Sequence, residues 1–169
     1  MAICVALIVV CSWLSFPLAV PITLQTFAIF SILGLLGGKR GTVVIVCYVV
    51  LGALGLPVFS NFKGGIGVIL HNVSGGYIIG FIFVAISYWI AVSVFGRKPT
   101  VEFVSLAIGM VLCYLAGTCW YMWLNVSKSG ALDFLNVLYV CVLPFILPDL
   151  IKLCVSLTLV TKLRKHLKL

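Results

Sequence analysis

An acid and a base lie three residues apart inside an apolar stretch near the end of the chain. The stretch runs from Val137 to Val160, and its charged side chains are Asp149 and Lys152. A charge at the centre of a membrane helix costs about 2.5–3.5 kcal/mol on insertion scales, so two such residues indicate a function. The i, i+3 spacing places both side chains on one helix face. They can therefore bind a polar ligand together, or form a structural salt bridge that satisfies two buried charges.

A proline adds a third polar group beside this pair. Pro148 has no N–H, so the carbonyl of Pro144 loses its helical partner. A free carbonyl, a carboxylate and an ammonium among apolar walls favour a small-molecule site toward the outer half of the membrane. The other acids are Glu102, at an expected cytoplasmic helix end, and Asp133, in an expected outer loop. No catalytic triad, metal-spaced cluster or phosphate loop is present, so we expect no enzyme, no metal and no cofactor.

The composition predicts an all-α integral membrane protein. Of the 169 residues 64% are hydrophobic and 8% charged, with a mean hydropathy of +1.34. A soluble domain of this length could not bury that much apolar surface. We expect a single transmembrane domain over 1–169, with no separate soluble domain, so any ATP hydrolysis would occur on partner chains. The six predicted transmembrane helices are 1–16, 24–37, 42–56, 77–95, 102–124 and 137–161.

The basic residues predict the orientation of these helices. The net charge is +8, and the basic residues gather in three clusters: Lys39-Arg40, Arg97-Lys98, and the tail with Lys162, Arg164, Lys165 and Lys168. All three clusters fall on one face of a six-helix protein, whereas the opposite face has Lys63 and Lys128. The positive-inside rule then places both termini in the cytoplasm and the protein in the cytoplasmic cell membrane. The tail is expected to contact membrane lipid, and no nucleic-acid partner is expected.

The segment from Val58 to Tyr77 has an unusual composition. It combines five glycines with polar residues and with Phe, Val and Ile. It is too apolar for a solvated loop and too rich in glycine for a regular helix. Irregular backbone near membrane depth survives where protein buries it or where it lines a cavity. We therefore expect a folded cap on the outer face; the alternative is a long extracellular loop without a ligand.

Two further patterns concern helix packing. Gly76-xxx-Gly80, at the start of the fourth predicted helix, favours close helix contact. The fifth predicted helix carries aromatic residues toward its outer end. They are Tyr114, Trp120, Tyr121 and Trp123. These aromatics fit an interfacial belt. Trp120 or Tyr121 could instead form the wall of a ligand site.

Several motifs occur in an order and spacing typical of one family. They are PITLQTF (Pro21–Phe27), LLGGKRG (Leu35–Gly41), YVVLGALGLPVF (Tyr48–Phe59), Gly64-Gly65, SGGY (Ser74–Tyr77) and LPDLIK (Leu147–Lys152). Over nearly its whole length the chain resembles the BioY family, the biotin-specific S components of energy-coupling-factor (ECF) transporters. The resemblance implies a compact six-helix bundle with a biotin pocket near the outer face. The loop after the first helix and the cap would cover that pocket.

The resemblance also implies roles for individual residues. Asp149 and Lys152 match the D-x-x-K pair of the family. Asp149 is expected to accept hydrogen bonds from the ureido N–H groups of biotin, and Lys152 to donate to a ureido or valerate oxygen. The further candidate ligand-binding residues are Gln25, Lys63, Asn72, Ser74 and Tyr77.

The chain departs from the family pattern at two positions of the cap. Asn72-Val73 stand where the family usually has Gly-Pro, and Lys63 stands where it usually has a small or polar residue. Lys63 therefore either meets the carboxylate of biotin or marks a lost contact.

Members of this family are not enzymes, and they act with other chains. The resemblance implies a transmembrane coupling subunit and two cytoplasmic ATPases as partners. Ala2 and Ala6 fit the start of the family's Ala-xxx-Ala docking pattern, although Val10 stands at the next position. Other functions open at this point are an S component for another vitamin, a stand-alone secondary biotin transporter and a non-transporting membrane scaffold.

Overall fold

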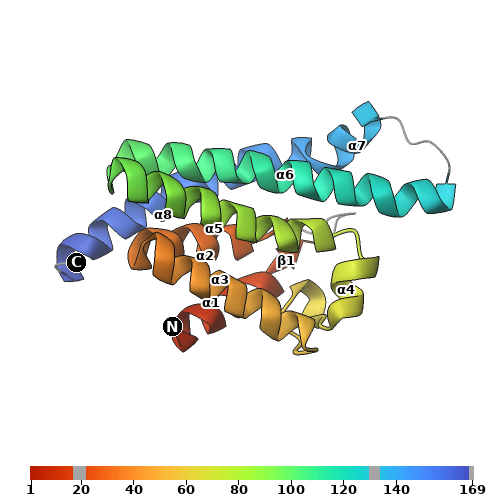
Figure 1. Cartoon of the computed structure of the whole chain (residues 1–169), viewed down its shortest axis with the longest axis horizontal. Coiled ribbons are helices and arrows are strands. Elements are labelled where there is room, and N and C mark those ends of the chain that lie inside the picture. Colours follow the sequence, from red (N-terminus) through yellow and green to blue (C-terminus); the bar gives the residue numbers. More distant parts are fainter. Residues whose placement is uncertain (17–21, 130–133, 168–169) are drawn as a thin grey trace.

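The apolar runs of the sequence form helices that lie side by side (Figure 1). The computed structural model describes residues 1–16, 22–129 and 134–167. In this part of the chain the longer helices are α1 (Ala2–Trp13), α2 (Gln25–Leu36), α3 (Gly38–Ala53), α5 (Gly75–Phe95), α6 (Pro99–Ser129) and α8 (Leu143–Leu167). The shorter elements are η1 (Ser60–Phe62), α4 (Ile66–His71), α7 (Phe134–Cys141) and the paired strands β1 (Ser15–Phe16) and β2 (Ile22–Thr23). The predicted loop residues Pro17, Pro21 and Asp133, and Lys168 of the tail, lie outside the described residues.

The helices differ in length more than the sequence suggested. Among the described residues, three segments are long and apolar enough to cross a membrane: Gly75–Phe95, Pro99–Leu124 and Val137–His166. By contrast α1 and α2 have 12 residues each, which is about 18 Å at 1.5 Å per residue against a hydrocarbon core of about 30 Å. Figure 1 shows α4 beyond the end of α3, and α4 packs on α3 and α5. Within the cap Phe59 and Ile69 are buried, whereas Asn61, Phe62 and Lys63 are exposed.

Several predicted helix bounds differ from the structure, and three of the differences have a local reason. The first helix ends at Trp13 rather than residue 16, because Ser15–Phe16 pairs as a strand with Ile22–Thr23. The third helix begins at Gly38 rather than residue 42, since the chain reverses at Gly37, whose φ of 81° favours glycine. The sixth predicted helix is interrupted at residue 142, where α7 ends and α8 begins, with a proline in the first turn of α8.

Close packing of α5 against α6 confirms the prediction from the two glycines. A Cβ at Gly76 would lie 2.3 Å from the Cβ of Trp120, and a Cβ at Gly80 would lie 2.6 Å from the Sγ of Cys113. The two helices are therefore as close as their backbones allow. Elsewhere α2 packs on α8, α3 on α5, and α1 on both α2 and α3.

A buried charge cluster joins the helices at the end of the molecule away from the cap. Glu102 is 2% exposed, and its carboxylate accepts hydrogen bonds from Arg164 Nη2 at 2.6 Å and Tyr88 Oη at 2.9 Å. Arg97 Nε lies 3.6 Å from the same carboxylate, while Arg164 Nε donates to the carbonyl of Gly34 at 3.1 Å. The sequence placed Glu102 at a helix end but did not reveal these partners. The cluster ties α2, α5, α6 and α8 together.

Candidate ligand-binding site

A cavity lies between the cap and the outer halves of α5, α6 and α8. Its volume is about 560 Å³, including its open mouth. The lining residues are Thr23, Gln25, Thr26, Phe59, Ser60, Ser74, Tyr77, Ile78, Phe81, Met110, Cys113, Tyr114, Phe145, Asp149 and Lys152. Aromatic and aliphatic side chains form most of the wall, and the polar groups are few. This combination is typical of a small-molecule site.

Asp149 is held by hydrogen-bond donors from three helices. It is 5% exposed, and its Oδ1 accepts from Thr26 Oγ1 at 2.8 Å and from Lys152 Nζ at 2.9 Å. Its Oδ2 accepts from Tyr114 Oη at 2.8 Å. A carboxylate has about four acceptor positions, so Oδ2 can take one further N–H or O–H donor without losing a partner. The site thus offers a fixed, buried acceptor to a ligand.

Lys152 uses all three protons of its ammonium group within the protein. Nζ donates to Asp149, to the carbonyl of Thr23 at 2.7 Å and to Thr26 Oγ1 at 3.3 Å. An ammonium group has three donors and no acceptor, so these three contacts satisfy it completely. The contact with Asp149 is the salt bridge that the i, i+3 spacing allowed. Lys152 can contact a ligand only by exchanging one of these three acceptors.

Gln25 lies at the first position of α2, within the second predicted helix. It is buried and lines the cavity. Its Nε2 donates to Tyr48 Oη at 2.8 Å, and Tyr48 Oη donates to the carbonyl of Val58 at 3.0 Å. The Gln25 amide is therefore held in place by α3 and by the first residue of the cap.

Tyr77 and Ser74 also line the cavity, at the junction of the cap with α5. Tyr77 Oη donates to the carbonyl of Cys141 at 2.9 Å, and its ring stacks on Phe145 with centroids 6.4 Å apart. With its hydroxyl already paired, Tyr77 presents mainly an aromatic face to a ligand.

The structure does not bring Lys63 and Asn72 to the cavity. The Lys63 side chain is exposed, and its carbonyl accepts from the N–H of Phe59 at 2.9 Å in a turn of the cap. The Asn72 carbonyl accepts from Trp120 Nε1 at 3.2 Å, so Asn72 joins the cap to α6. Trp120, predicted either as part of a belt or as a wall, supports the cap and is not among the lining residues of the cavity. Tyr114, predicted only as part of the belt, does line the cavity.

Two residues at the polar end of the site were not predicted. Thr26 belongs to the PITLQTF motif but carries no sequence signal that links it to an acid 123 positions later. Tyr114 stood among the outer aromatics, and its contact with Asp149 depends on where α6 meets α8.

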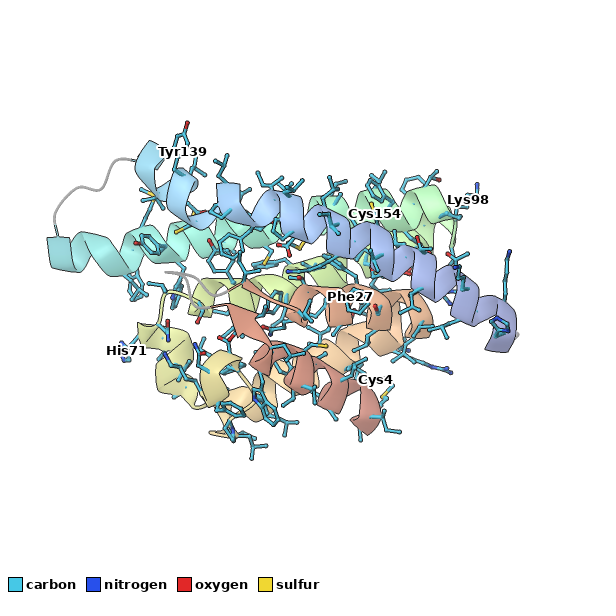
Figure 2. The ribbon with its side chains drawn as sticks, turned by 180° about the vertical axis from the view of Figure 1, so that it is seen from behind. Cys4, Phe27, His71, Lys98, Tyr139 and Cys154 are labelled. Carbon is cyan, nitrogen blue, oxygen red and sulfur yellow. The ribbon has the colours of Figure 1, made fainter. Side chains whose placement is uncertain are left out.

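The two ends of the bundle can be told apart in the second view (Figure 2). Figure 2 shows His71, on the cap, and Lys98, in the turn between α5 and α6, at opposite ends of the bundle. Both termini lie toward the end opposite α4 in Figure 1. The cavity therefore faces away from the clustered basic residues.

Comparison with known proteins matches residues 1–169 to the BioY family. The chain belongs to the BioY family. The protein called biotin transporter BioY from Thermotoga maritima is 38% identical over 174 residues, which covers 95% of this chain and 90% of the relative. The probable biotin transporter BioY of Pyrococcus horikoshii is 38% identical over 145 residues, covering 86% of this chain and 81% of the relative.

A solved structure shares the fold of this BioY-family chain. It is the crystal structure at 2.1 Å of the S-component for biotin from an ECF-type ABC transporter. The TM-score is 0.83 at 28% sequence identity, with 97% of this chain and 88% of the other covered. The prediction of an S-component helical bundle is therefore confirmed.

Proposed function

We propose that this chain is the biotin-binding membrane subunit, or S component, of an ECF-type vitamin uptake transporter. The observation that carries the proposal is the buried Asp149, held by three donors with one acceptor position left over in a mainly apolar cavity. The names of the relatives and of the solved S component support the choice of biotin.

The chemistry of biotin fits the polar and apolar parts of the cavity. Its ureido group presents N–H donors, and we assign one of them to the open position on Asp149 Oδ2. A second ureido N–H would have to displace Tyr114 or Lys152 from the carboxylate. The fused rings and the valerate chain would pack against apolar side chains, while Ser60 and Ser74 supply hydroxyl groups from the cap.

The first helix offers a surface for a partner subunit. Ala2 and Ala6 are exposed, and beside them the apolar side chains of Ile3, Leu7 and Val10 are 85%, 46% and 51% exposed. We propose that this face of α1 meets the transmembrane coupling subunit, and that ATP is hydrolysed by separate cytoplasmic subunits. The basic end of the bundle then faces the cytoplasm across the inner cell membrane.

Titration calorimetry on the purified chain tests this function. We expect tight one-to-one binding of biotin, and its loss in Asp149→Asn, which keeps the shape but removes the charge. Glu102→Gln is the matched control, because it neutralises the other described buried carboxylate at the opposite end of the bundle. Well-folded protein that binds no biotin, or that prefers riboflavin, thiamine or niacin in competition, would overturn the assignment of the ligand.

A further inference from the structure

The end of α1 is hydrogen-bonded to the beginning of the cap. Ser12 is fully buried, and its single hydroxyl proton is shared between the carbonyl of Val58, 2.6 Å from Oγ, and that of Val9 in its own helix, 2.7 Å from Oγ. Trp13 Nε1 donates to the carbonyl of Pro57 at 3.0 Å. We call these two long-range hydrogen bonds the α1–cap contact. They join consecutive side chains of one helix to two consecutive carbonyls, those of Pro57, just before the cap, and of Val58, its first residue.

The same carbonyl of Val58 leads directly to the ligand cavity. It also accepts from Tyr48 Oη, which in turn accepts from Nε2 of the cavity residue Gln25. The next two residues of the cap, Phe59 and Ser60, line the cavity themselves. A shift of Val58 would therefore alter the cavity both through the chain and through the hydrogen bonds to Gln25.

The backbone that follows is held in an uncommon conformation against α1. Asn61 and Phe62 have φ angles of 59° and 57°, a region that side chains other than glycine rarely adopt. The Phe62 ring lies 4.7 Å from the Trp13 ring, and Ser15 Oγ donates to Asn61 Oδ1 at 3.3 Å. Such a conformation persists only where its surroundings hold it, and here residues at the end of α1 and just after it supply part of that support.

We propose that Ser12 and Trp13 are positioning residues that couple a displacement of α1 to the opening of the ligand cavity. The proposal rests on the proposed function and extends it, because α1 carries the face assigned to the coupling subunit and its end is hydrogen-bonded to Pro57 and Val58. A partner that moves α1 pulls on the carbonyls of Pro57 and Val58, and the cavity wall at Phe59 and Ser60 follows.

The release of labelled biotin from nanodisc-embedded protein tests the coupling with matched pairs of variants. Ser12→Ala removes the hydrogen bond to the cap, whereas Ser156→Ala removes an equally buried hydroxyl that donates to Leu153 within its own helix. Trp13→Phe and Trp89→Phe form a second pair, at side chains 36% and 40% exposed. We expect Ser12→Ala and Trp13→Phe to release biotin about fivefold faster, the factor that matches one net hydrogen bond of about 1 kcal/mol. The two control variants should release biotin at the wild-type rate.

Hydrogen–deuterium exchange supplies a readout that needs no ligand and that separates coupling from general loss of stability. The N–H of Phe59 is bonded within the cap, to Lys63, and the N–H of Gly65 is bonded to Gly52 of α3. These amides should exchange faster in Ser12→Ala and Trp13→Phe, while those of α5 and α6 keep their wild-type rates. Exchange that rises evenly along the chain, or release no faster than in the control variants, would overturn the inference. Wild-type protein that binds no biotin would instead overturn the proposed function, and exchange would still decide the role of the contact. The partly exposed Trp13 keeps the test available if Ser12→Ala does not fold.

Discussion

Thr26 gives the sharpest test of how the site holds its acid. Its hydroxyl donates to Asp149 Oδ1 at 2.8 Å and accepts from Lys152 Nζ at 3.3 Å, so one small side chain orients both members of the charged pair. Thr26→Val keeps the shape of the side chain and removes both contacts. The carboxylate would then keep only Lys152 and Tyr114 as donors, and one ammonium proton would lose its acceptor.

The expected change in biotin affinity follows from the charges on the hydrogen-bonded groups. A hydrogen bond to a charged partner contributes about 1.5–3 kcal/mol, and about 1.4 kcal/mol corresponds to a tenfold change in affinity. If the orientation of Asp149 is what Thr26 contributes, Thr26→Val should raise the Kd for biotin about 10- to 100-fold. The unfolding free energy should fall by about 1–3 kcal/mol, because a buried donor of Lys152 is left unpaired.

Titration calorimetry and thermal melting of three variants separate the loss of the Thr26 hydroxyl from a general effect of removing a buried hydroxyl. Thr26→Ser keeps the hydroxyl and should bind nearly as wild type. Thr42→Val removes a similarly buried hydroxyl, which donates to the carbonyl of Gly38 at 2.8 Å, and should leave the Kd unchanged. Unchanged affinity in Thr26→Val would refute the reasoning, as would Thr26→Ser binding as weakly as Thr26→Val.

Three further predictions concern the charged pair, the helix packing and the inner charge cluster. Lys152→Met should weaken biotin binding and lower the unfolding free energy by about 3–5 kcal/mol, because it leaves a buried carboxylate without its cation; unchanged melting would contradict this. Gly80→Ala should lower the unfolding free energy by about 1–3 kcal/mol, since its Cβ would lie 2.6 Å from a side chain of α6. The control Gly67→Ala, with open space around its Cβ, should melt at the wild-type temperature. Arg164→Gln should lower the melting temperature yet change the Kd less than tenfold, and a larger loss of affinity would show that the inner cluster shapes the ligand site.

The sequence could predict those features that depend on neighbours within a helical turn. Asp149 and Lys152 stand out because an apolar run makes any charge costly, and their spacing alone places them on one face. Gly76 and Gly80 indicate a close helix contact by the same local rule. The glycine-rich composition of the cap predicted irregular backbone, although neither its short helix α4 nor the exposure of Asn61, Phe62 and Lys63.

The partners of these residues depended on tertiary structure. Thr26 and Tyr114 reach Asp149 across 123 and 35 positions of sequence, because α2 and α6 both lie beside α8. The exposure of the Lys63 side chain likewise depends on how the cap packs, so no local pattern revealed it. The sequence alone determined a membrane bundle with one costly charged pair, since hydrophobicity and helical spacing are local properties. Which side chains satisfy that pair, and which carbonyls α1 holds, depended on how the helices pack, since those contacts join residues that only the folded chain brings together.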